Sequence, residues 1–144
     1  LDVVGWDLHE TTAGGPFRDI LNFDILVHCA LARSPTAPFL RRSMLHDPAR
    51  LRTIVDVTCD IGGPLNLLPI AENLTSIDEP VHRLGPSSAP IDFIAIDHLP
   101  TLLPLESSLD FSKQLLPSLE SLAQSSDVWR RAGNVFLQKS QAYQ

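Results

Sequence analysis

The feature that most constrains the fold is an apolar run that ends in two polar residues and is followed by prolines. Residues 91–99 read Ile-Asp-Phe-Ile-Ala-Ile-Asp-His-Leu, and prolines follow at positions 100 and 104. Such a run is typical of a buried strand, and a proline stops a strand from continuing. In open α/β sheets, ligands bind outside the carboxyl ends of the strands. We therefore expect Asp97 and His98 to lie at the edge of a binding site.

Two other segments share this character. Residues 23–31 and 53–60 are almost continuously apolar or β-branched, which is typical of parallel strands covered on both faces. Shorter strands are predicted at residues 1–7, ending in the carboxylate of Asp7, and at residues 81–84. The first hundred residues are therefore predicted to be dominated by strands.

The pattern changes to helical spacing after residue 104. Leucines between residues 105 and 122 recur at three- and four-residue intervals, and a second amphipathic segment covers about residues 127–138. The predicted fold is α/β, with a Rossmann-like, mostly parallel sheet followed by C-terminal helices. We expect residues 1–100 to belong to the sheet domain and residues 101–144 to the helical segment.

Composition excludes several classes of function. The chain has 11 basic and 17 acidic residues and a formal net charge of −6, so we expect neither nucleic-acid nor membrane binding. Its cysteines, Cys29 and Cys59, lack the spacing of a zinc site or a disulfide framework. His28 and Cys29 are strand neighbours that point to opposite faces, so no metal site is expected there. The sequence predicts a soluble, cytoplasmic protein.

A complete dinucleotide-binding domain has a Gly-x-Gly-x-x-Gly turn after its first strand. The two glycine pairs of this chain, at positions 14–15 and 62–63, are each followed by proline, which lacks the backbone N–H that a phosphate site needs. The sheet is therefore expected to lack its first strand and its glycine turn.

Several motifs, in order along nearly the whole chain, resemble the carboxyl-terminal part of saccharopine dehydrogenase of the NAD-dependent, lysine-forming type. The most specific motif is Ile-Asp-His-Leu-Pro-x-Leu-Leu-Pro at residues 96–104. The other motifs are Trp6-Asp7, Glu10-Thr11, Gly14-Gly15-Pro16-Phe17, Pro35-x-Ala37-Pro38-Phe39, residues 51–60, Leu115-Leu116-Pro117-Ser118-Leu119 and Val128-Trp129.

The resemblance implies an enzyme that oxidises saccharopine with NAD and releases lysine and 2-oxoglutarate, in a cleft between two domains. It implies that Asp7 binds the adenosine ribose. The implied cofactor-binding residues are Asp7, Thr11, Cys29, Leu31, Val57, Ile96, Asp97, His98 and Leu99. The implied substrate-binding residues are Thr58, Cys59 and Asp60.

The resemblance also implies what the chain lacks. In this family the catalytic lysine and histidine lie in an amino-terminal domain that no part of this sequence matches, so we expect no catalytic residue here and an inactive chain when alone. Residues 64–67 read Pro-Leu-Asn-Leu where the family usually has Pro-His-Asn-Pro. A noncatalytic remnant, a protein-interaction module and a structural module without a ligand remain alternatives.

Several of the implied site residues also have purely structural interpretations. Asp7 and Asp60 are equally compatible with turn or helix-cap positions, and His98 with a structural histidine bonded to backbone. Cys29 and Cys59 are compatible with small packed side chains.

Overall fold

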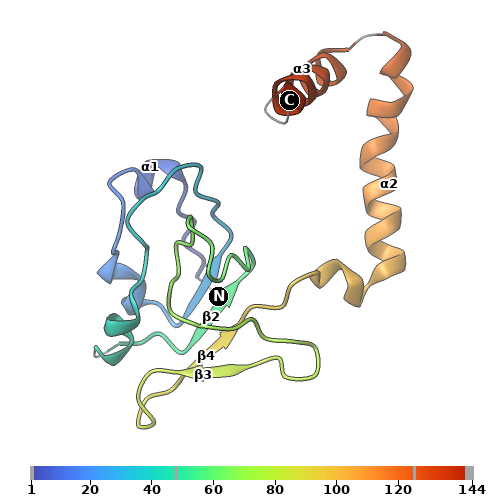
Figure 1. Cartoon of the computed structure of the whole chain (residues 1–144). Coiled ribbons are helices and arrows are strands. Elements are labelled where there is room, and N and C mark those ends of the chain that lie inside the picture. The colour runs from blue at the N-terminus through green and yellow to red at the C-terminus, as the bar shows by residue number, and fades with distance from the viewer. Residues whose placement is uncertain (1, 48, 125, 142–144) are drawn as a thin grey trace. The chain divides into compact units, whose positions relative to one another are not determined.

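The computed structural model describes residues 2–47, 49–124 and 126–141, which form two compact units (Figure 1). The first unit is Leu1–Asp97 and the second is His98–Gln144.

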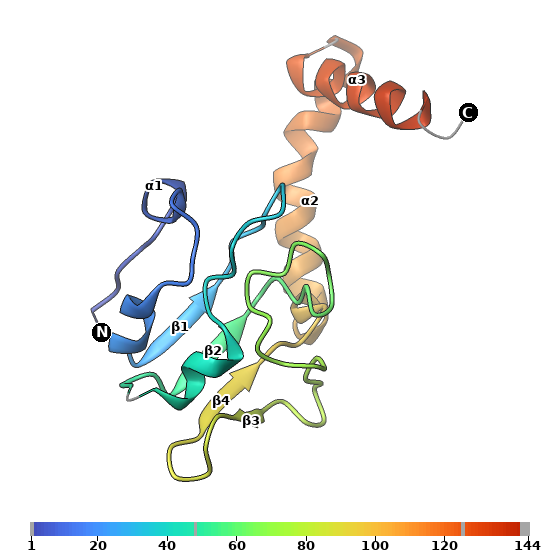
Figure 2. The same cartoon turned by 60° about the vertical axis from the view of Figure 1, so that its left-hand side comes forward.

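A four-stranded sheet is the centre of the first unit. Its strands are β1 (Ile25–His28), β2 (Thr53–Asp56), β3 (His82–Leu84) and β4 (Ile91–Ile94), in the order β1-β2-β4-β3. Strands β1, β2 and β4 are parallel, and their arrowheads point the same way in Figure 2, whereas β3 is antiparallel to β4. These strands confirm the predicted α/β fold with a mostly parallel sheet.

The strands are shorter than the apolar runs that predicted them. β1 ends at His28 and β2 at Asp56, and residues 57–60 form bends and irregular structure rather than more strand. Beyond β4, Ile96 forms one isolated parallel bridge with Thr75. The residues that follow each parallel strand therefore form irregular segments at the carboxyl edge of the sheet.

The two faces of the sheet differ in burial because successive side chains point to opposite sides. Ile54 and Phe93, which are paired across β2 and β4, are fully buried on one face. They belong to a hydrophobic core that also contains Ile20, Leu21, Phe39, Leu40, Met44, Leu45, Leu51, Leu67, Leu68, Ile70, Ile91 and Ala95.

The opposite face is largely open within this unit. Ile25 and Val27 of the edge strand β1 are 51% and 58% exposed, and their β2 partners Thr53 and Val55 are only half-buried. The expectation that both faces are covered is therefore wrong for the unit itself. Apolar side chains on both faces of a strand indicate that both faces are buried in the complete protein. They do not indicate that residues of the same unit bury them.

The predicted strand at residues 1–7 does not form, because residues 2–7 have no regular structure. Asp7 instead caps the short helix α1 (Leu8–Thr11) in a capping box with Glu10, accepting a hydrogen bond from the Leu8 N–H at 2.7 Å. An aspartate that binds nearby backbone N–H groups favours a helix start over a strand end.

Two 3-10 helices contribute to the buried core of this unit. These are η1 (Arg18–Asn22) and η2 (Arg42–His46), each with two buried apolar residues. η1 begins two residues after Pro16, at Arg18.

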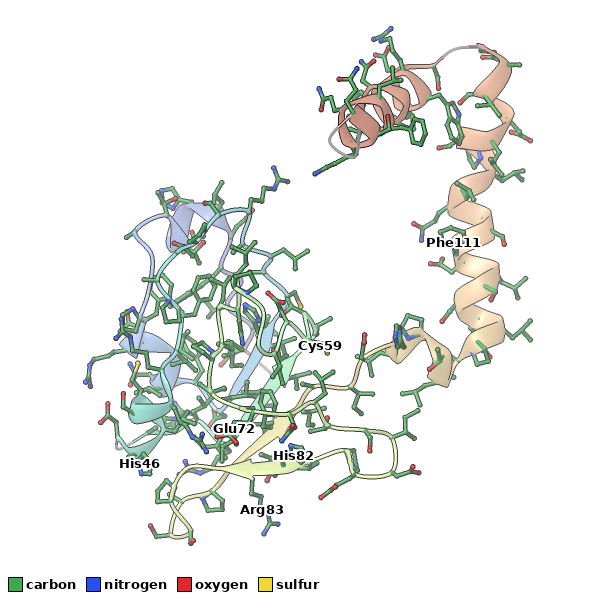
Figure 3. All side chains as sticks on the ribbon, in the orientation of Figure 1. His46, Cys59, Glu72, His82, Arg83 and Phe111 are labelled. Atoms are coloured by element: carbon green, nitrogen blue, oxygen red, sulfur yellow. The ribbon has the colours of Figure 1, made fainter. Side chains whose placement is uncertain are left out.

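The second unit is helical, as predicted. It contains η3 (Leu99–Leu102), α2 (Pro104–Glu120), η4 (Leu122–Gln124) and α3 (Asp127–Gln141). The indole N–H of Trp129 in α3 donates to the carbonyl of Ser118 in α2 at 2.5 Å. Large apolar side chains such as Phe111, which projects from α2 in Figure 3, remain exposed in this unit. Among the described helices, none is long and apolar enough to span a bilayer.

Replacing Phe93 by alanine tests the core. Phe93 is fully buried, so Phe93→Ala is expected to lower the free energy of unfolding by about 3–5 kcal/mol, through lost burial and the cavity left behind. Urea unfolding followed by circular dichroism measures the change. The matched control is Phe136→Ala, at a position that is 70% exposed, with an expected change within about 0.5 kcal/mol. Equal effects of the two substitutions would contradict this core.

The open β1 edge generates a second prediction. An exposed apolar edge strand favours pairing between chains, and a lysine on it opposes pairing. We expect the purified chain to self-associate and Val27→Lys to reduce that association, as measured by light scattering over a concentration series. Val135→Lys, at an exposed position of α3, is the control and is expected to change association less. A wild-type chain that stays monomeric throughout would refute this prediction.

Candidate functional site

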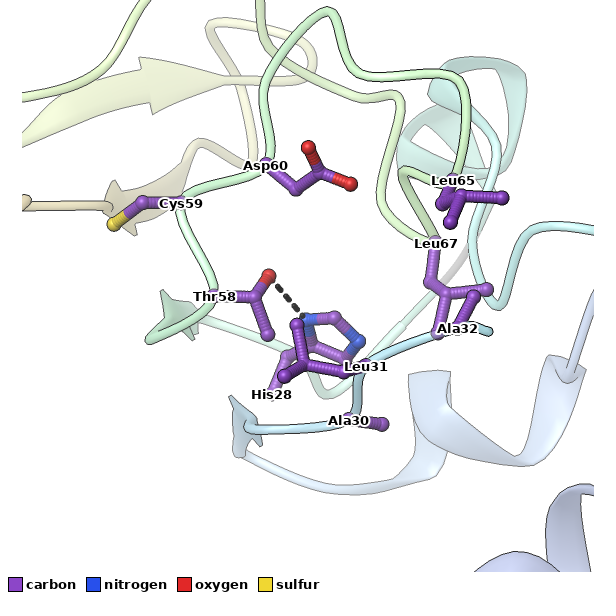
Figure 4. A pocket seen from close by; sticks show the side chains of 9 residues that line it. All are labelled: His28, Ala30, Leu31, Ala32, Thr58, Cys59, Asp60, Leu65 and Leu67. Atoms are coloured by element: carbon purple, nitrogen blue, oxygen red, sulfur yellow. Dashed lines mark hydrogen bonds between the residues drawn. The ribbon is translucent and has the colours of Figure 1, made fainter. Parts of the chain in front are cut away.

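The carboxyl ends of β1 and β2 border the candidate site. Because parallel strands end at the same edge of a sheet, the segments that follow β1 and β2 lie close together there. They enclose a pocket of about 300 Å³, shown in Figure 4. Its lining consists of His28, Ala30, Leu31, Ala32, Thr58, Cys59, Asp60, Leu65 and Leu67.

Asp56 organises the polar side of this pocket. Its Oδ1 lies 3.0 Å from Nδ1 of His28 and accepts hydrogen bonds from the Thr58 hydroxyl at 2.7 Å and the Thr58 N–H at 3.1 Å. The side chains of His28 and Asp56 are 3% and 1% exposed. One buried carboxylate oxygen thus connects the end of β1 with the turn that follows β2.

The hydrogen bonds at Asp56 define its charge and the tautomer of His28. Burial raises the pKa of Asp56, but the hydrogen bonds from His28 and Thr58 and the charge on His28 outweigh it, so this pKa lies below its ordinary value. An ionised carboxylate only accepts hydrogen bonds. Nδ1 of His28 therefore carries the hydrogen, and in the neutral ring Nε2 presents a lone pair.

Two buried atoms of this pair have no hydrogen-bond partner among the described residues. They are Nε2 of His28 and Oδ2 of Asp56. Buried polar atoms are nearly always paired, so an unpaired ring nitrogen in a pocket wall indicates a place for a ligand or a water.

Asp60 and Cys59 lie next to each other but point in different directions. In Figure 4 the Asp60 carboxylate extends toward the Leu65 side of the pocket, whereas the Cys59 sulfur points away from it. A Cβ on Gly63 would lie only 2.0 Å from Oδ1 of Asp60, so the glycine leaves room for this carboxylate.

Cys59 follows the end of β2 (Figure 3) in a left-handed conformation, with φ of 52°. Burial, and then the charges of Asp56 and Asp97, raise the pKa of the Cys59 thiol. A thiol that holds its proton in this way is a poor nucleophile.

The structure brings some of the predicted site residues together. Leu31, Thr58, Cys59 and Asp60 line the pocket. Asp97 does not line it, but its charge acts on Cys59. Cys29, Val57 and Asp97 are exposed, and Ile96 is half-buried.

Other predicted residues lie elsewhere. Asp7 and Thr11 belong to α1 and are joined by a hydrogen bond from the Thr11 hydroxyl to the Asp7 carbonyl at 2.9 Å. His98 and Leu99 belong to the second unit, where His98 has a φ of 59° at the start of η3. Of the three predicted site carboxylates, Asp7, Asp60 and Asp97, the pocket lining contains Asp60 alone.

Sequence reasoning missed five lining residues, which are His28, Ala30, Ala32, Leu65 and Leu67. It considered His28 only as a metal ligand, and it did not assign Leu65 or Leu67 to a site, although residues 64–67 stood out as a departure from the family pattern. In the described part of the chain, no three His, Cys, Asp or Glu side chains cluster as metal ligands would. The available signal for His28 was its position at the end of an apolar strand.

Asp56→Asn tests the buried pair. The substitution removes the charge that accepts three hydrogen bonds, so we expect the free energy of unfolding to fall by about 2 kcal/mol at pH 7. Because folding lowers the pKa of Asp56, its stabilisation is complete above the unfolded-state pKa of about 3.9 and is lost as pH falls through the folded-state pKa. Urea unfolding between pH 7 and pH 2.5 measures this.

The control for this experiment is Asp92→Asn, which affects an exposed ion pair with Arg83 at 3.7 Å. Its effect is expected to stay below about 1 kcal/mol. A difference between wild type and Asp56→Asn that does not shrink in acid would contradict the described role of Asp56.

Comparison with known proteins gives a consistent set of relatives. No family model matches the chain. The chain is 43% identical over 139 residues to the saccharopine dehydrogenase [NAD(+), L-lysine-forming] of Candida glabrata, covering 94% of this chain and 37% of that protein. The enzymes of the same name from Schizosaccharomyces pombe and Neurospora crassa are 40% and 41% identical, and the chain spans 38% of each.

The chain thus spans well under half the length of the curated relatives that it matches. Nearly all of it is nevertheless related in sequence to the NAD(+)-dependent, L-lysine-forming saccharopine dehydrogenases, and the share of their length that it covers fits a carboxyl-terminal part.

Proposed function

We propose that this chain forms the carboxyl-terminal part of an NAD-dependent saccharopine dehydrogenase and contributes half of its cofactor and substrate site. The observation that carries the proposal is the pocket at the carboxyl ends of parallel strands, in a chain about 40% identical to such enzymes. Ligands of α/β sheets bind at this edge.

The residues assigned to the cofactor carry groups that suit a dinucleotide. Asp7 is exposed, and its carboxylate, which caps α1, has lone pairs left for ribose hydroxyls, since a carboxylate offers about four acceptor positions. Leu31 and Val57, which are 77% and 45% exposed, offer apolar surface to an aromatic ring. Thr11 and Cys29 would border the same ligand. The chain has no glycine turn for the phosphates, so the rest of the parent protein would supply that contact.

The substrate would bind next to the nicotinamide. We propose that Thr58, Cys59 and Asp60 face saccharopine and that residues 96–99 surround the nicotinamide end. NAD, when bound, accepts a hydride from saccharopine, and hydrolysis of the resulting imine gives lysine and 2-oxoglutarate. The role of this chain in that reaction is to bind and orient the two molecules.

Acid–base catalysis would come from an amino-terminal domain, which is the proposed partner of this chain. A cytoplasmic location is part of the same proposal and is supported by the sequence reasoning above.

Calorimetric titration with NAD tests the proposal directly. The chain is titrated alone and then together with an amino-terminal portion taken from a relative. NAD binding by the pair, with turnover of saccharopine, supports the proposal. Binding without turnover favours a noncatalytic remnant, and no heat at millimolar NAD in either case rejects a cofactor site.

Asp7→Ala tests the ribose assignment. In the assembled protein the substitution is expected to weaken NAD binding by about 1–3 kcal/mol, because ribose hydroxyls lose a charged acceptor. Asp7→Asn separates this effect from capping, since asparagine caps helices as well as aspartate does. Glu10→Ala, which disrupts only the capping box, is the control. NAD affinity that stays unchanged in Asp7→Ala would refute the assignment.

A further inference from the structure

An exposed loop follows the pocket-lining end of β1. Residues 33–37 are all exposed, and they form bends and irregular structure rather than helix or strand. In Figure 2 the chain that leaves the β1 arrowhead runs on beyond the sheet before it turns back. Both ends of the loop are held, because Ala32 lines the pocket and the Ala37 carbonyl accepts a hydrogen bond from the Gly15 N–H at 3.4 Å. The loop is thus presented to solvent from a fixed position.

The backbone of this loop is unpaired. In the described part of the chain, residues 33–36 make no hydrogen bond through backbone or side chain. Unpaired N–H and C=O groups of an extended segment are the groups with which a peptide-binding protein pairs. Pro35 disfavours the helical region for Ser34, the residue before it, and so favours an extended conformation there. Ser34 therefore combines an exposed, unbonded hydroxyl with an extended backbone.

The proline after Ser34 sets this serine apart from other exposed serines. Of the 12 prolines in the sequence, Pro35 alone follows a serine or a threonine. Proline-directed protein kinases recognise the acceptor residue by the ring that follows it, which lacks the N–H that another residue would leave unpaired there. Ser43 is also exposed and also follows an arginine, but it lies within η2 and precedes Met44. Exposure alone does not distinguish Ser34, whereas the proline and the unpaired backbone do.

We propose that Ser34 is a phosphorylation site for a proline-directed protein kinase. Oγ of Ser34 attacks the γ-phosphorus of ATP, so that a new O–P bond forms while the bond from this phosphorus to the β,γ-bridging oxygen breaks. ADP leaves with that oxygen and its electron pair, and a base of the kinase takes the hydroxyl hydrogen. The product carries about two negative charges at pH 7, where the serine had none.

The added charge acts on the neighbouring pocket. Ser34 is two residues beyond Ala32 of the lining, so the Cα atoms of these residues are at most about 7 Å apart. This separation is comparable to the Debye length of about 8 Å at physiological ionic strength, so salt screens the charge only in part. Where the pocket takes a dinucleotide, a phosphate on Ser34 repels the phosphates of the ligand. This consequence rests on the proposed function, whereas the phosphorylation site does not.

Treatment of the 144-residue chain with ATP and a cyclin-dependent kinase tests the site, and mass spectrometry of its peptides locates the phosphate. We expect one phosphate per chain, on Ser34, and at least tenfold less incorporation in Ser34→Ala and in Pro35→Ala, which keeps the hydroxyl. Neither substitution removes a hydrogen bond of the described structure, so both variants are expected to fold.

Ser43→Ala is the matched control for the kinase experiment and is expected to incorporate as much phosphate as the wild type. Phosphate on Thr36 or Ser43 in place of Ser34, or equal incorporation in the wild type and Pro35→Ala, would overturn the proposal.

NAD titration tests the consequence for the pocket. The chain is phosphorylated before assembly with the amino-terminal portion, and Ser34→Ala treated in the same way is the control. The phosphorylated protein is expected to bind NAD about threefold more weakly in 10 mM salt, and the difference is expected to fall below about 1.5-fold in 0.5 M salt, because the repulsion is electrostatic. Equal NAD affinity with and without the phosphate would refute the effect on the pocket. An assembled protein that is phosphorylated on Ser34 but binds no NAD in either form would refute the proposed function and leave the phosphorylation site intact.

Discussion

A single buried carboxylate oxygen, Oδ1 of Asp56, determines the geometry of the candidate site. It accepts hydrogen bonds from His28 at the end of β1 and from the hydroxyl and backbone N–H of Thr58 after β2. In a low-dielectric interior such bonds are strong, and losing one donor leaves the charge poorly compensated. The bend after β2 and the position of the hydrogen on Nδ1 of His28 follow from this arrangement.

The fold was largely predictable because its signals are local. Apolar runs identified the parallel strands, and leucine spacing identified α2. The two wrong predictions about strands also have local causes. Residues 1–7 look like a strand, but Asp7 binds the N–H groups of α1 instead. β2 ends early because the Asp56 side chain accepts the Thr58 N–H and so stabilises a turn in place of further strand.

The site was predictable only in part. The resemblance pointed to four lining residues, Leu31, Thr58, Cys59 and Asp60. The five that it did not name are His28, Ala30, Ala32, Leu65 and Leu67. The importance of His28 depends on its being opposite Asp56, 28 residues later, which no local pattern reveals. The exposure of the sheet face around Ile25 and Val27 was likewise not predictable from local sequence, because composition does not show which part of a protein covers a surface.

The partnership of His28 and Asp56 also specifies how β1 and β2 align. The two residues are direct partners across the strands, and Val27 and Val55 are the preceding pair. With valine, isoleucine and leucine on both sides of β1, hydrophobicity alone discriminates poorly between this register and one shifted by a single residue. A shift of β1 by one residue would turn the His28 imidazole to the open face and leave the Asp56 carboxylate buried without this partner. The polar pair therefore selects one register from several that are nearly equal in apolar contact.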